Sequence, residues 1–181
     1  MIARRAVAIG GFLAAGLVLV AGGYARSAGY RLNTTSSLPM GIWRTASVAH
    51  LARGDVVTFC PPATAPFELA HWRGYLAPGA CPSGYEIMMK PVAALPGDTV
   101  TVSAAGIAVD GKPLPNSHLL ARDYEGRPLK AVAPGTYTVP AGEMWVVSSF
   151  NARSYDSRYF GPVPIAAVHA QAHPILIDET P

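Results

Sequence analysis

Two residues of this 181-residue chain, Ser37 and Lys90, have settings suited to nucleophilic catalysis. Ser37 lies in the turn-like segment 35–41, Thr-Ser-Ser-Leu-Pro-Met-Gly, and Lys90 follows the apolar stretch 87–89. A serine hydroxyl becomes a good nucleophile when a neighbouring base takes its proton, and lysine is such a base only when its amine is neutral. Burial among apolar side chains disfavours the ammonium and lowers its pKa. The two residues therefore predict a hydrolase with a Ser/Lys dyad.

The N-terminal segment predicts a single membrane-spanning helix. Residues 6–25 contain no charged side chain, and Arg4, Arg5 and Arg26 flank them. As a helix this segment extends about 30 Å, the thickness of a hydrocarbon core. The positive-inside rule puts the arginine-bearing N-terminus in the cytoplasm and the rest of the chain outside it. The alternative is a cleaved signal peptide, but the apolar run exceeds the usual length of about 7–15 residues.

Charge and cysteine content limit the partners and the compartment. The chain has 14 basic and 11 acidic residues, and without Arg4 and Arg5 the balance is 12 to 11, so no electrostatic footprint for nucleic acid remains. Cys60 and Cys81 are its two cysteines, and on the oxidising side of a membrane they are expected to form a disulfide. Two free, buried thiols are the alternative.

Beyond residue 25 the pattern is that of a mostly β domain. Eighteen glycines and 17 prolines separate short apolar segments, and no sustained helical periodicity is present. Asp110-Gly111 predicts a hairpin turn, and a short helix is expected near Phe67–Tyr75. The predicted strands are Gly41–Thr45, Asp55–Phe59, Glu86–Ala94, Thr99–Val102, Ile107–Val109, Thr136–Val139, Met144–Ser148 and Ala167–Ile177.

Three sequence motifs occur in a characteristic order behind the apolar segment. They are Ser-Leu-Pro-Met-Gly at 37–41, Lys-Pro-Val-Ala-Ala-Leu-Pro-Gly-Asp at 90–98 and Ser-Tyr-Asp-Ser-Arg-Tyr-Phe-Gly-Pro-Val at 154–163. Together they resemble the boxes of the type I signal peptidase (S26) family. The Ser-x-Pro-x-Gly form of the first motif is similar to the TraF branch, the conjugative-transfer signal peptidases that mature pilin subunits. Such a resemblance implies a signal-peptidase-like β catalytic domain.

The resemblance implies roles for the residues that could act directly on a substrate. Ser37 matches the family nucleophile, and Lys90 matches the general base. Thr35 matches a position whose hydroxyl, with the backbone N–H of the nucleophile, forms the oxyanion hole. Pro39 and Gly41 are expected to fix a turn that exposes the serine and leaves space for substrate backbone.

The third motif supplies supporting residues. By resemblance, Ser154 orients the lysine amine, and Asp156 and Arg158 form a bracing ion pair. In an extended segment these three side chains share one face. Pro91 stands where typical bacterial signal peptidases have an arginine, so Asp156 must find another partner, and Arg158 is the first candidate. Without that neighbouring cation, burial must account for more of the lowering of the Lys90 pKa.

These observations predict a domain organisation with no cofactor. The expected parts are a cytoplasmic tail (1–5), a transmembrane helix (6–25) and a periplasmic peptidase domain (26–181) with irregular excursions at 61–85 and 111–135. The pair His169 and His173 is four residues apart, but a strand-like context before Pro174 disfavours a metal site, so none is predicted.

The predicted function is that of a serine endopeptidase of the bacterial inner membrane. Its expected substrate is a membrane-inserted preprotein, by resemblance a conjugative pilin precursor, whose maturation can include cyclisation. Expected partners are that precursor, the membrane and components of a conjugation or type IV secretion apparatus. The alternatives are a general type I signal peptidase and a non-catalytic periplasmic assembly factor of such a secretion channel.

Overall fold

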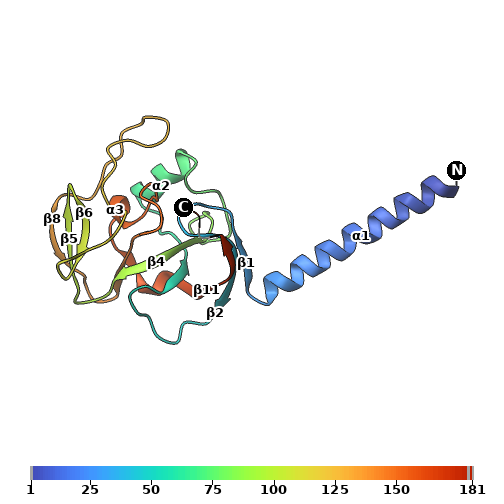
Figure 1. Cartoon of the computed structure of the whole chain (residues 1–181), viewed down its shortest axis with the longest axis horizontal. Helices are drawn as coiled ribbons and strands as arrows, with labels where there is room; N and C mark the ends of the chain where they lie inside the picture. Colours follow the sequence, from blue (N-terminus) through green and yellow to red (C-terminus); the bar gives the residue numbers. More distant parts are fainter. Residues whose placement is uncertain (1, 179, 181) are drawn as a thin grey trace.

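A computed structural model describes residues 2–178 and 180 of the chain. It begins with helix α1 (Ile2–Ser27), which projects away from the rest of the molecule (Figure 1). Within the described part of the chain, no helix combines the length and the apolar character needed to cross a lipid bilayer. The membrane span predicted over residues 6–25 is therefore not confirmed and stays a prediction.

The remainder is mostly β, as predicted, and its larger sheet contains seven strands that pair antiparallel. Near the C-terminus, β11 is hydrogen-bonded between β2 and β3, so segments far apart in the sequence lie side by side (Figure 1). The strands in spatial order are β1 (Tyr30–Asn33), β2 (Met40–Ala46), β11 (Val168–Asp178), β3 (Val56–Phe59), β4 (Met88–Ala94), β9 (Glu143–Val146) and β10 (Val163–Pro164).

The smaller sheet has four strands and follows directly from β4 along the chain. Its hairpin turn is at Asp110-Gly111, as the sequence predicts, and both residues have positive φ angles, 48° and 75°, as a type I′ turn requires. The strands in spatial order are β7 (Lys112–Pro113), β6 (Gly106–Val109), β5 (Thr99–Ser103) and β8 (Gly135–Thr138).

The eight predicted strands all form, with ends shifted by no more than two residues. Strands β1, β7 and β10 were not predicted, because Tyr-Arg-Leu-Asn is too polar to show a pattern and the other two strands have only two residues each. The helices are α2 (Ala65–Trp72), which overlaps the predicted one and has Pro66 in its first turn, α3 (Ser157–Phe160) and a 3-10 turn η1 (Ile165–Ala167).

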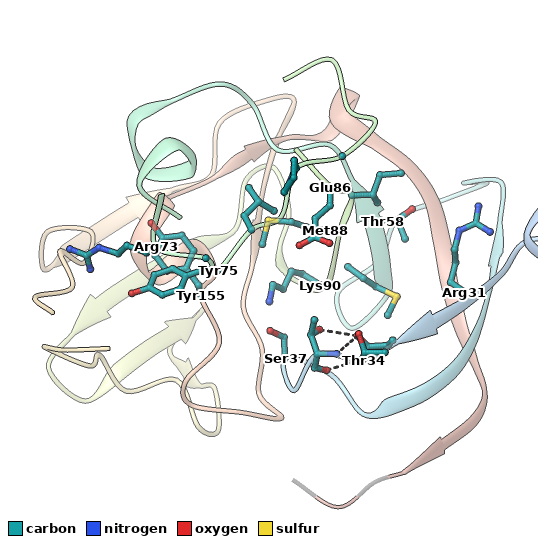
Figure 2. A pocket seen from close by; sticks show the side chains of 18 of the residues that line it. Arg31, Thr34, Ser37, Thr58, Arg73, Tyr75, Glu86, Met88, Lys90 and Tyr155 are labelled. Carbon is teal, nitrogen blue, oxygen red and sulfur yellow. Dashed lines mark hydrogen bonds between the residues drawn. The ribbon is translucent and has the colours of Figure 1, made fainter. Parts of the chain in front are cut away.

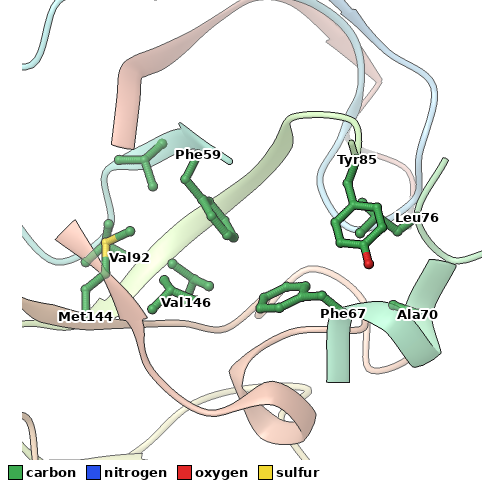
Figure 3. Packing of buried hydrophobic residues seen from close by; sticks show 10 residues of the cluster. Phe59, Phe67, Ala70, Leu76, Tyr85, Val92, Met144 and Val146 are labelled. Atoms are coloured by element: carbon green, nitrogen blue, oxygen red, sulfur yellow. The ribbon is translucent and has the colours of Figure 1, made fainter. Parts of the chain in front are cut away.

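The core consists of two main apolar clusters, and β9 contributes to both. Met144 and Val146 point to one face of β9, and Trp145 points to the other, because successive side chains alternate across a strand. In the first cluster α2 packs Phe67 and Ala70 over the large sheet (Figure 3). The second cluster fills the space beneath the small sheet. The two clusters thus lie on opposite faces of β9, a strand of the large sheet.

Cys60 and Cys81 form a disulfide, with their Cα atoms 5.5 Å apart. The bond joins the residue after β3 to the irregular segment 61–85. That segment carries Tyr75 and Leu76, which line a large cavity of the domain. The disulfide therefore ties one wall of this cavity to the central sheet.

Candidate active site

A cavity of about 900 Å³ brings together residues from distant parts of the chain. Ser37 and Lys90 both line it, and Tyr75 and Tyr155 line it farther along. Figure 2 shows the tips of the Ser37 and Lys90 side chains directed toward one another. This serine and this lysine are 53 positions apart in the sequence, so only the folding of β4 beside the β1–β2 loop places them in one site.

Ser37 lies in the loop between β1 and β2 and is half-buried. Gly41, at the start of β2, has a φ of 137°, and a Cβ atom there would lie 2.2 Å from the carbonyl oxygen of Leu176 in β11. The glycine is therefore required by the close approach of a neighbouring strand. The expectation that it leaves space for substrate backbone stays a prediction.

Asn33 holds the Ser37 loop from inside, and the sequence analysis missed it. Its side chain is buried, and its Nδ2 lies 3.0–3.1 Å from the carbonyl oxygens of Thr35, Leu38 and Pro39. Its Oδ1 accepts from the backbone N–H of Thr35 at 3.1 Å. An Asn that hydrogen-bonds the backbone two residues on is a known turn signal, and this signal was present in the sequence. One side chain thus fixes the turn on both sides of the serine.

Thr35 is held by the same asparagine. Its hydroxyl donates to Asn33 Oδ1 at 2.8 Å, and the residue lines the cavity together with Ser37. The threonine hydroxyl is therefore oriented by a buried partner in the vicinity of the nucleophile.

We expect Asn33→Asp to disrupt this loop. A carboxylate only accepts hydrogen bonds, so it would face three carbonyl oxygens without a proton to share. The free energy of unfolding should fall by about 3 kcal/mol, the range for a buried charge left without a partner, and turnover should fall about 100-fold, since a misplaced reacting group costs roughly that much. Urea denaturation and a cleavage assay measure the two effects.

The control is Asn116→Asp, at an exposed asparagine whose Nδ2 makes a single hydrogen bond, to the carbonyl of Ser149. It should leave both quantities nearly unchanged. Equal effects of the two substitutions would contradict the role assigned to Asn33.

Lys90 lies on β4, is only 4% exposed, and pairs with Val57 of β3. Its Nζ donates to Ser154 Oγ at 3.0 Å. Burial lowers the pKa of Lys90 to about 8; the negative charge of Asp156 opposes this shift, and the positive charge of Arg158 adds to it. A substantial fraction of this amine is therefore neutral at mildly alkaline pH, as a general base must be.

The third motif is not extended, contrary to expectation. Residues 157–160 form the helical turn α3, and Asp156 caps it by accepting from the backbone N–H of Arg158 at 3.2 Å. Ser154, Asp156 and Arg158 are nevertheless all buried and all connected. A helix of only four residues leaves no periodicity in the sequence, which explains the error.

Arg158 is the partner of Asp156, as the sequence analysis suggested. Its Nε donates to Oδ1 and its Nη2 to Oδ2, each at 2.8 Å, so the pair is bidentate. Both side chains are 0% exposed. Nη1 reaches the carbonyls of Asn116, His118 and Ala152 at 2.9–3.2 Å. The charge is thus fully compensated, which is what allows an arginine to be buried.

Comparison with known proteins identifies the family. The family model for signal peptidase, peptidase S26, matches residues 4–177. The chain is 42% identical to the plasmid transfer protein TraF of Escherichia coli over 171 residues, which cover 94% of this chain and 93% of that protein. It is 44% identical to the conjugal transfer protein TraF of Agrobacterium fabrum over 149 residues, 82% of each chain.

Likeness to signal peptidase I itself is more distant. The enzyme of Leptolyngbya laminosa is 31% identical over 113 residues, 62% of this chain and 46% of that protein. A crystal structure of a signal peptidase I from Enterococcus faecalis V583 is 25% identical, covers 69% of this chain and 98% of the other, and has a TM-score of 0.40. The family model matches nearly the whole length of this chain, which therefore belongs to the signal peptidase family, peptidase S26.

Proposed function

We propose that this protein is a serine endopeptidase with Ser37 as nucleophile and Lys90 as general base. The single observation that carries the proposal is a fully buried lysine of lowered pKa that lines the same cavity as a serine on a fixed loop. Burial of an ionisable group is costly in free energy, and such perturbed groups cluster at functional sites.

The reaction proceeds in two acyl-transfer steps. Neutral Lys90 takes the hydroxyl proton of Ser37 as the serine oxygen attacks the scissile carbonyl. The resulting ammonium returns that proton to the leaving amine, and the acyl-enzyme remains. Water, or an amine in the case of cyclisation, then attacks the ester with Lys90 again as base. The ester C–O bond breaks, and the ammonium returns the proton to the Ser37 oxygen, which restores the free enzyme. The Thr35 hydroxyl turns from Asn33 toward the oxyanion and, with the Ser37 N–H, stabilises it, each donor contributing about 3 kcal/mol.

The substrate we propose is a membrane-inserted preprotein, specifically a conjugative pilin precursor. Support comes from the similarity to plasmid and conjugal transfer proteins over more than four fifths of the chain. The main alternative, a general type I signal peptidase, is supported by weaker likeness that covers less than half of the relative. A non-catalytic assembly factor would have no need of a buried lysine.

We also propose that α1 anchors the catalytic domain at the periplasmic face of the inner membrane. Leu17, Val18, Leu19 and Val20 on this helix are 69–76% exposed, so their apolar surface has no partner within the domain. Arg4 and Arg5 lie at the N-terminal end of this helix, before the uncharged segment 6–25, which favours a cytoplasmic N-terminus. Fractionation and protease protection of intact spheroplasts test this placement.

The experiment that tests the function is co-expression of the full chain with candidate pilin precursors, followed by mass analysis of the products. The expected result is a shortened precursor whose mass defines one cleavage site, and a further loss of one water identifies cyclisation. Precursors of unchanged mass across conjugative pilins, with cleavage of an ordinary secretory preprotein, would support the general signal peptidase. No cleavage of either class would contradict the proposal.

A further inference from the structure

The buried ion pair between Asp156 and Arg158 is connected to both members of the proposed dyad, by two separate routes. The resemblance to known peptidases accounts for the pair as a brace and for Ser154 as a partner of the lysine. It does not account for Ser148, a residue with 0% exposure that stands between Asp156 and the nucleophile loop.

The first route joins Asp156 to Ser37. Asp156 Oδ2 accepts from the backbone N–H of Ser148 at 3.0 Å. The Ser148 hydroxyl donates to the backbone carbonyl of Ser37 at 2.5 Å. The same hydroxyl oxygen accepts from the backbone N–H groups of Phe150 at 3.2 Å and Asn151 at 3.3 Å. Two donors thus occupy its lone pairs, so its one proton is directed at the Ser37 carbonyl.

The second route joins Arg158 to Lys90. Arg158 Nη2 donates to the carbonyl of Ser154 at 2.9 Å, and Ser154 Oγ accepts from Lys90 Nζ at 3.0 Å. The planar guanidinium of Arg158 and the planar carboxylate of Asp156 bind each other in a bidentate way. The distance between Asp156, where the first route starts, and Arg158, where the second starts, is therefore fixed.

We propose that Ser148 is a positioning residue for the nucleophile, through which Asp156 sets the place of Ser37 relative to Lys90. The inference rests on the function proposed above. Hydrogen bonds from Ser148 to the carbonyl of Ser37 and from Asn33 to those of Leu38 and Pro39 hold three consecutive peptide groups. The direction of the Ser37 Cα–Cβ bond, and so the line of attack, follows from them.

Electrostatics favour this positioning role over activation of the lysine. The charge of Asp156 raises the pKa of Lys90, which works against the burial that makes the amine a base. An aspartate kept at this place therefore does not help Lys90 to lose its proton. Through its hydrogen bond with the Ser148 N–H, Asp156 instead helps to position the nucleophile loop.

The test compares Ser148→Ala with Ser117→Ala in the full chain, on a precursor that the wild type cleaves. Ser117 is a matched control, since it is a buried serine that donates to a carbonyl, that of Leu114, at 2.7 Å and accepts from the N–H of Ile107 at 3.0 Å. Both variants lose a similar buried hydrogen bond and should lose similar stability. We expect kcat to fall about 100-fold in Ser148→Ala only, with KM little changed, because the reacting oxygen is displaced.

The pH profile separates positioning from general disruption. Ser148→Ala should lower kcat at every pH without moving the midpoint near pH 8, whereas Ser154→Ala should move it, because that serine contacts the amine. Should Ser148→Ala fail to fold, Ser148→Cys is used in its place, because the thiol fills the same space and is a weaker hydrogen-bond donor. The same fall in kcat and the same unchanged midpoint are expected for it. A kcat equal to that of Ser117→Ala, or a shifted midpoint, would overturn the inference. Cleavage by Ser37→Ala would instead overturn the proposed function.

Discussion

Replacing Lys90 by methionine should abolish cleavage and at the same time stabilise the protein at neutral pH. Methionine has a similar length and no charge, so it fits the buried site without the cost of desolvating an ammonium. The general base is lost, and turnover should fall about 10⁴-fold or more, as for removal of a member of a catalytic unit. The free energy of unfolding should rise by about 3 kcal/mol at pH 7, from a pKa difference between 10.5 unfolded and about 8 folded.

The size of this stability effect depends on pH. Between about pH 8 and 10.5 the unfolded chain binds more protons at Lys90 than the folded chain, so wild-type stability rises with pH there. Below about pH 8 both states are protonated and the whole penalty is present. The increase in the free energy of unfolding caused by Lys90→Met should therefore be constant below pH 8. It should shrink from pH 8 upward and vanish above pH 10.5.

Urea denaturation across this pH range measures the effect, with Lys130→Met as the control at an exposed lysine. The control should change neither stability nor turnover appreciably. A destabilised Lys90→Met variant at pH 7 would show that the buried amine has a structural role, and one that still cleaves would reject Lys90 as the general base.

Ser37→Ala should abolish cleavage without affecting the fold. The hydroxyl is the proposed nucleophile, so no acyl-enzyme can form, and turnover should fall about 10⁴-fold or more. The backbone carbonyl that binds Ser148 remains, as do the contacts of Asn33 with the loop. The free energy of unfolding should accordingly change by less than about 0.5 kcal/mol.

Ser36→Ala is the matched control, because it removes a hydroxyl one residue away that is exposed and does not line the cavity. Quantitative mass analysis of precursor and product, with thermal unfolding of each variant, compares the two. Normal turnover in Ser37→Ala, or equal losses in both variants, would reject Ser37 as the nucleophile.

Strand positions were predictable because their signal is local. Alternating threonine and valine mark β5, and short apolar runs beside glycine or proline mark β2 and β6 in the sequence itself. The Asp110-Gly111 turn requires positive φ at both central positions, which this dipeptide tolerates. Strand β1 was missed because its sequence is largely polar, and β7 and β10 because each is only two residues long. Helix α3 was missed because a four-residue helix is too short to show a helical period.

The candidate site was predictable only in part, for the same physical reason. Ser37, Lys90 and Ser154 could be singled out because their motifs are continuous in sequence. Asn33 carried a turn signal that could have been read. Ser148 carried none: its hydroxyl acts on a carbonyl 111 residues away, and no property of its neighbours indicates that contact.

The sequence by itself determined the chemistry that is available: a serine on a turn, a lysine after an apolar stretch, and a mostly β scaffold to hold them. The tertiary structure alone decided where those groups meet. It buried Lys90 deeply enough to lower its pKa, and it turned the third motif into a cap with a bidentate ion pair. Local sequence patterns encode backbone conformation, but burial and hydrogen bonds between distant residues arise only when β4, β9 and the β1–β2 loop pack together.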